Sequence, residues 1–140
     1  MPVRIVADTN TALSGLLWQG PPRRLINLAR ERAFTLCTSV ALLAELAEVI
    51  GRAKFAARVH AAELSAADLV QDYARLAEIV VPALLPKPVS RDPDDDLVLA
   101  TALGAEASLI VSGDRDLLVL GTFRDIRILA ATDALAAIGR

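Results

Sequence analysis

Short apolar runs alternate along the chain with longer segments in which apolar residues recur every three or four positions. The short runs are rich in valine, isoleucine and leucine and are flanked by turn-forming or charged residues, which predicts strands. The predicted strands are residues 3–7, 34–37, 79–81, 108–111 and 126–129. The predicted helices are residues 9–18, 23–32, 40–50, 65–78, 93–103 and 133–138, with one helical turn over 117–120. This alternation predicts an α/β layer fold around a mostly parallel sheet of about five short strands.

Residues that favour helix starts precede several of the predicted helices. Ser39 and Ser65 carry hydroxyls that suit N-caps, and Asp92 is followed by a proline, which suits the first helical position. Thr132 is expected to cap the last helix in the same way.

Length and composition fit one domain over residues 1–140, without a linker or an internal repeat. No apolar run reaches the roughly 18 residues that a membrane span needs, and the start lacks a secretory signal. The single cysteine, Cys37, excludes an internal disulfide and fits a reducing compartment, so we expect a cytoplasmic protein without a membrane partner. The net charge of −2 excludes the overall basic field of many nucleic-acid binders.

Carboxylates stand at the ends of the predicted elements. Asp8 follows the first strand, Asp114 follows the fourth, and Glu45 lies in the helix after the second. Because the carboxyl ends of parallel strands meet at one edge of a sheet, these groups are expected to lie at the same edge. Asp116 is placed either beside Asp114 or as a cap on the next helical turn.

Each of these acids also has a simpler structural interpretation. Asp8 suits a helix N-cap. Glu45 has no basic residue three or four positions away, whereas Glu48 has Arg52 four positions on. An unpaired carboxylate among apolar residues is costly unless something neutralises it, although a glutamate at the helix margin remains the alternative.

The cluster of residues 92–96 leaves one choice open. Its first acids are explained by the helix cap and the helix dipole. Asp96 lies a full turn into the helix and shares a stripe with Leu99 and Leu103, so it can point towards the edge of the core. Spacing alone does not separate Asp96 from Asp95.

Acids at the ends of separate elements are together the ligand set that a divalent cation needs. Clustered carboxylates repel one another, and Mg²⁺ or Mn²⁺ relieves that repulsion. Two such ions about 4 Å apart activate water and stabilise a leaving oxygen in phosphodiester hydrolysis.

Four stretches of the chain, in family order, resemble the PIN domain. They are VRIVADTN at 3–10, Glu45, DLVLATA at 96–102 and SGDRD at 112–116. The resemblance covers essentially the whole chain. The PDDD and SGDRDLL sequences are similar to those of the VapC-like toxins of bacterial toxin–antitoxin pairs. It implies a Rossmann-like three-layer sandwich and a ribonuclease that depends on Mg²⁺ or Mn²⁺.

The resemblance also implies a set of site residues. Its acids correspond to Asp8, Glu45, Asp96 (in preference to Asp95) and Asp114, with Asp116 as a frequent companion to Asp114. The supporting polar residues correspond to Thr9, Asn10 and Ser112. The implied reaction is hydrolysis of an RNA phosphodiester to 5′-phosphate and 3′-hydroxyl ends, and the implied partners are RNA, a second copy in a homodimer and an antitoxin protein.

Two arginines flank the acids and are candidates for positioning phosphates. Arg91 and Arg115 have an equally good interpretation as charges that damp carboxylate repulsion. Two other functions stay open. One is a catalytically silent PIN-like module that binds RNA or a partner, which the intact acid set argues against. The other is phosphoryl transfer through an aspartyl-phosphate at Asp8, although Asn10 stands where such enzymes typically carry a second aspartate.

Overall fold

Six strands form one sheet in the order β3-β2-β1-β4-β6-β5. The computed structural model describes residues 3–138, so positions 1, 2, 139 and 140 of the predicted domain lie outside the described residues. The strands are β1 (Arg4–Ala7), β2 (Thr35–Thr38), β3 (Glu78–Ile79), β4 (Leu109–Val111), β5 (Thr122–Phe123) and β6 (Ile126–Leu129). All neighbouring pairs are parallel except β5 and β6. The predicted, mostly parallel α/β sheet is therefore confirmed.

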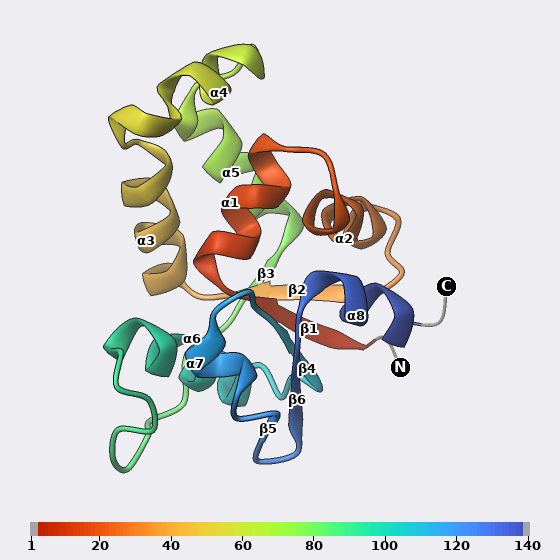
Figure 1. The fold of residues 1–140 in the computed structure, drawn as a ribbon, viewed down its shortest axis with the longest axis vertical. Helices are drawn as coiled ribbons and strands as arrows, with labels where there is room; N and C mark the ends of the chain where they lie inside the picture. Colours follow the sequence, from red (N-terminus) through yellow and green to blue (C-terminus); the bar gives the residue numbers. More distant parts are fainter. Residues whose placement is uncertain (1–2, 139–140) are drawn as a thin grey trace.

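Helices cover both faces of this sheet (Figure 1). They are α1 (Thr9–Leu17), α2 (Pro21–Arg30), α3 (Val40–Ile50), α4 (Ala56–Ala61), α5 (Ala66–Leu76), α6 (Pro93–Gly104), α7 (Arg115–Leu118) and α8 (Ala131–Ala137), with a 3-10 turn, η1, at Ala53–Phe55. The predicted N-caps at Ser39, Ser65 and Asp92 are confirmed, since each side chain accepts a backbone N–H of its helix.

Alternating side chains along the strands separate two apolar cores. Ile5 of β1 belongs to a core with α1, α2, α3, α5 and α8, whereas its neighbour Val6 belongs to a core with α6 and α7. The same alternation separates Leu109 from Ile110 in β4. In Figure 1, α1, α2, α3 and α5 lie above the sheet, whereas α6 and α7 lie below it. The fold is therefore a three-layer sandwich, as predicted.

The order of the strands creates a switch point beside β1. The chain runs from β1 through β2 to β3 at one edge and then returns to place β4 on the other side of β1. Crossovers therefore leave in opposite directions between β1 and β4, and ligands of parallel sheets bind at the carboxyl ends of such strands. Asp8 follows β1 and Ser112 follows β4 directly, so both lie at this point.

Three local differences from the sequence prediction have identifiable causes. Helix α2 begins at Pro21 rather than Arg23, because proline is well suited to the first helical turn. The prediction that Thr132 caps the last helix is wrong, since α8 already starts at Ala131 without a side-chain cap. Strand β5 was not predicted because it is only two residues long and pairs through a tight turn in which Arg124 and Asp125 adopt positive φ without any glycine.

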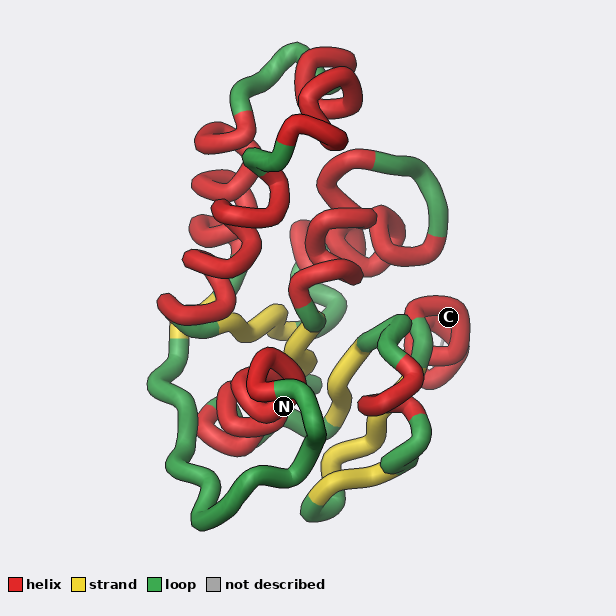
Figure 2. The backbone as a smooth tube through the Cα atoms, turned by 60° about the vertical axis from the view of Figure 1, so that its left-hand side comes forward, coloured by secondary structure: helices red, strands yellow, loops and turns green. Residues whose placement is uncertain are grey.

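Residues 80–92 form a long loop between β3 and α6, drawn in green in Figure 2. Its first part is fastened to the sheet and to α6: Val80 N donates to Thr38 O (2.8 Å) and Ala83 N donates to Ala100 O (2.9 Å). Its end delivers Asp92 to the start of α6. Among residues 3–138, every helix is too short or too polar to cross a bilayer.

Candidate active site

An acidic pocket of about 210 Å³ opens at the switch point. It is lined from the end of β1, the start of α1, one side of α3, the start of α6 and the turn before α7. The lining residues are Asp8, Thr9, Asn10, Glu45, Val49, Arg52, Asp92, Asp94, Asp95, Val98 and Asp114. The predicted gathering of acids from separate elements at one edge of the sheet is thus present.

Asp8 is held in place through both of its carboxylate oxygens. Oδ1 accepts the backbone N–H of Thr11 (2.9 Å), which makes Asp8 the N-cap of α1, and Oδ2 accepts the hydroxyl of Ser112 (2.6 Å). The residue is only 7% exposed. Ser112 Oγ in turn accepts the backbone N–H of Asp114 (2.9 Å). Asp8 therefore caps α1, and it also lines the acidic pocket.

Three carboxylates converge on one point of the pocket. Asp92, Asp95 and Asp114 each place a carboxylate oxygen within 4.8 Å of the other two. Asp95 is 5% exposed. Burial and then repulsion by Asp114 raise the pKa of Asp95 to about 6, although Ser90 Oγ donates to Asp95 Oδ2 (3.2 Å) and acts in the opposite direction. The cluster carries more negative charge than its surroundings compensate.

The structure places Asp95, and not Asp96, in the pocket. The carboxylate of Asp96 instead accepts backbone N–H groups of the preceding loop, from Val89 (3.1 Å to Oδ2) and Ser90 (2.7 Å to Oδ1). This corrects the expectation that Asp96 faces the site. Both residues share apolar stripes of α6, so periodicity alone did not distinguish them. The spacing of three between Asp92 and Asp95 is the signal that was missed, since it puts the cap and Asp95 on one face.

Glu45 faces the start of α1 across the pocket. The hydroxyl of Thr9 donates a short hydrogen bond to Glu45 Oε1. Burial raises the pKa of Glu45, and the neighbouring carboxylate of Asp94 raises it further, while the Thr9 hydrogen bond opposes both effects. Glu48, by contrast, is exposed and forms the predicted ion pair with Arg52. Asp94 is a second pocket acid that the sequence interpretation assigned only to the helix dipole.

A buried hydroxyl pair fixes α3 against α6 behind the site. Ser39 Oγ, the N-cap of α3, and Thr101 Oγ1 of α6 lie 3.0 Å apart, and neither residue is appreciably exposed. This contact therefore joins α3, which carries Glu45, to α6, which carries Asp95. Asn10 lines the pocket beside Thr9.

The arginines near the pocket differ in their availability. Arg91 is exposed and pairs with Asp116 (3.2 Å), so these two neutralise one another outside the three-acid cluster. Arg115 is exposed on α7 and is absent from the pocket wall. Arg52 does line the pocket, and a two-point contact holds it to Glu48 (2.6 and 3.2 Å). Arg52 is therefore the arginine best placed to meet a ligand in the acidic pocket.

The donor set fits a divalent cation with oxygen ligands. Asp92, Asp95 and Asp114 come from two elements, supply only carboxylate oxygens and lie close enough to share one ion. Burial and then repulsion by Asp114 raise the pKa of Asp95, and a bound cation would offset both effects. Asp8 borders the same pocket, with its orientation fixed by Ser112.

Comparison with known proteins agrees with this geometry. Searches of curated proteins and of solved structures gave no match. A family model described as the PIN domain matches residues 4–116, which include every acid of the pocket. PIN domains are generally nucleases that use divalent metals, so the match supports a hydrolase acting on nucleic acid. The chain belongs to the PIN-domain family.

Proposed function

We propose that this protein is a ribonuclease that depends on Mg²⁺ or Mn²⁺ and hydrolyses phosphodiester bonds in the acidic pocket. The observation that carries the proposal is the cluster of Asp92, Asp95 and Asp114 at the switch point of a PIN fold. In this proposal Asp95 takes the role that the sequence interpretation gave to Asp96. Three convergent carboxylates repel an RNA phosphate unless cations intervene, so metal dependence follows from the charge of the site.

The carboxylates of the cluster would hold the cation. Asp114 is oriented by Ser112 through its backbone N–H, and Asp8 is oriented by Ser112 through Oδ2. A bound divalent cation supplies Lewis acidity that neutralises phosphate charge and makes water more acidic. The outer contacts of its ligands, here Ser112 and Ser90, determine how well the ligands are preorganised.

Glu45 is the group placed to accept a proton. Its raised pKa makes it a stronger base than an ordinary glutamate, and Thr9 fixes Oε1 by a hydrogen bond on the pocket wall. Arg52, on the same wall, would hold a phosphate oxygen of the substrate. These roles give the pocket a base on α3, a cation site at the starts of α6 and α7, and a phosphate contact just after α3.

The biological role we propose is that of the toxin in a toxin–antitoxin pair, acting as a homodimer. The resemblance of the PDDD and SGDRDLL stretches to VapC-like toxins supports this role. The acidic pocket is also complementary to a basic side chain from an inhibitory antitoxin peptide. Co-expression with the product of an adjacent small reading frame, followed by size determination of the purified species, tests both partners.

The test of the nuclease is cleavage of single-stranded and structured RNA with Mn²⁺, Mg²⁺ or EDTA. We expect metal-dependent cutting that is lost in Asp8→Asn and in Asp95→Asn. Asp125→Asn is the matched control, because Asp125 lies in the β5–β6 turn and asparagine tolerates its positive φ. RNA binding without cutting by the wild type would instead identify a silent binding module. Cutting that survives both pocket substitutions would contradict the proposed site.

A further inference from the structure

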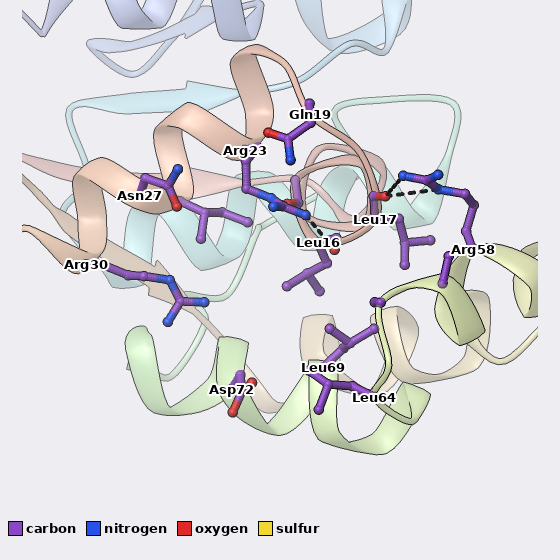
Figure 3. Close-up of a pocket in the computed structure, with 14 residues that line it drawn as sticks. Leu16, Leu17, Gln19, Arg23, Asn27, Arg30, Arg58, Leu64, Leu69 and Asp72 are labelled. Atoms are coloured by element: carbon purple, nitrogen blue, oxygen red, sulfur yellow. Dashed lines mark hydrogen bonds between the residues drawn. The ribbon is translucent and has the colours of Figure 1, made fainter.

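A second cleft, of about 470 Å³, lies on another part of the molecule (Figure 3). Its floor is the last part of α1, and its walls come from α2, α4 and α5. It shares no lining residue with the acidic pocket. Leucines 16, 17, 64 and 69 make part of the lining apolar, whereas Arg23, Asn27 and Arg30 form a polar stripe along one side of α2.

Two arginines of this cleft are fixed by the end of α1. Arg23 donates through Nε to Gly15 O (2.6 Å) and through Nη2 to Leu16 O (3.1 Å), and Arg58 of α4 donates twice to Leu17 O (2.6 and 3.2 Å). These carbonyls lie in the last turn of α1 and have no partner within the helix. The contacts hold the guanidinium groups in place and offset part of their positive charge through the helix dipole, but no carboxylate of residues 3–138 forms an ion pair with Arg23 or Arg58.

The cleft therefore carries unbalanced positive charge. Within residues 3–138, none of the ion pairs includes Arg23, Arg30 or Arg58. The one acid of the lining, Asp72, lies across from Arg30 in Figure 3 and is itself 3.9 Å from Arg75. Three arginines thus face one aspartate in a protein whose overall charge is negative. An anion is the ligand that this arrangement favours.

We propose that this cleft binds a phosphorylated nucleoside, with the phosphate on Arg30 and the unused N–H groups of Arg23. The planar guanidinium fork matches phosphate oxygens in pairs. Leu64, which is 43% exposed, receives the base together with the small accessible edges of Leu16 and Leu69, while Asn27 offers an amide for hydrogen bonding. The volume lies in the range of pockets that enclose small ligands. The ligand is either a free nucleotide or the phosphorylated end of an RNA chain, and the inference does not depend on the proposed nuclease activity.

The test is a titration of the full chain in EDTA with 5′-AMP and with adenosine, followed by calorimetry or by NMR shifts. We expect saturable binding of AMP and binding of adenosine weaker by about tenfold, since a charge-assisted contact is lost. Arg30→Ala should weaken AMP binding by about tenfold without unfolding the chain, because the Arg30 side chain makes no hydrogen bond within the described residues. Arg24→Ala is the matched control on α2, since Arg24 is exposed and lies outside the cleft.

Further probes assign the source and the place of the ligand. A short oligonucleotide with a 5′-phosphate that binds better than its 5′-hydroxyl counterpart identifies an RNA end, and AMP binding alone identifies a free nucleotide. Equal AMP binding by wild type and Arg30→Ala overturns the proposal. So does AMP binding that is lost in Arg52→Ala, which would place the ligand in the acidic pocket. Binding of a glutamate-rich peptide in preference to AMP would also overturn it and would point to a protein partner.

Discussion

Ser112 Oγ donates a 2.6 Å hydrogen bond to Asp8 Oδ2, and so joins residues 104 positions apart in the chain. The same oxygen accepts the backbone N–H of Asp114 (2.9 Å). One buried hydroxyl therefore sets the relative position of an acid after β1 and an acid after β4. The two strands lie side by side at the switch point, which explains why so small a group can organise the pocket.

Ser112→Ala should reduce metal-dependent cleavage by roughly 10- to 100-fold, because the outer contact that orients two pocket acids is removed. The free energy of unfolding should fall by about 1 kcal/mol, the usual value of one hydrogen bond. Cleavage rate and urea denaturation measure the two effects. Ser108→Ala, at an exposed serine before β4, is the control. An activity unchanged in Ser112→Ala would show that Asp8 does not need this contact.

Asp95→Asn and Asp96→Asn should have opposite consequences. Asp95→Asn removes a carboxylate from the three-acid cluster, so it should abolish stabilisation by Mn²⁺ and raise the melting temperature of the metal-free protein. Asp96→Asn should keep the response to Mn²⁺ but destabilise the fold by about 1–2 kcal/mol, because the carboxylate accepts two backbone N–H groups of the loop. Thermal denaturation with and without Mn²⁺ distinguishes them. If Mn²⁺ no longer stabilised Asp96→Asn but still stabilised Asp95→Asn, the result would support Asp96 as the site residue, as the sequence analysis expected.

Asp95 and Asp96 also show which features of the site can be predicted from sequence patterns and which cannot. The helix over α6, its cap at Asp92 and its apolar character are encoded locally and were predicted. The choice between Asp95 and Asp96 depends on where the loop of residues 80–92 lies, because backbone N–H groups of this loop donate hydrogen bonds to the Asp96 carboxylate. That contact is tertiary, so spacing within the helix indicates only that Asp95 shares a face with Asp92 and does not show what Asp96 binds. Arg52 was not predicted to line the pocket. Its expected ion pair with Glu48 already accounted for its charge, and its position relative to the pocket depends on tertiary structure.

The affinity of the pocket for Mn²⁺ should fall as the pH drops through about 6, because metal-free Asp95 takes up a proton there that the cation must displace. The metal-free protein should show the opposite trend in stability. A carboxyl group whose pKa is raised in the folded state stabilises the fold at low pH, and this contribution is lost between pH 3.8 and about 6. Asp95→Asn should remove that part of the dependence, on the order of 3 kcal/mol. Denaturant titrations of both proteins across this range in EDTA provide the measurement; parallel curves would contradict the raised pKa.

Arg52→Ala should raise the KM for RNA and leave the affinity for Mn²⁺ unchanged, because Arg52 lines the pocket without being a ligand. We expect a change of about tenfold for one lost charge-assisted contact. Arg91→Ala is the comparison, since Arg91 is exposed and pairs with Asp116 away from the cluster. Steady-state kinetics at two salt concentrations measure the effect. An equal rise in KM for both variants would mean that only the general charge of this surface matters.

Gly104→Ala should be the most damaging of these substitutions for folding, although Gly104 lies at the far end of α6 from the pocket. A Cβ atom there would lie 2.0 Å from Val81 O and 3.1 Å from Ala83 N, both of which are backbone atoms that cannot rotate away. The loop that delivers Asp92 would have to shift, at a cost of about 2–3 kcal/mol. Gly51→Ala is the control, because its nearest neighbour, Ala47 O, would be at 3.3 Å. If urea denaturation gives the same midpoint for both variants, the start of this loop does not pack against α6 as closely as the structure shows.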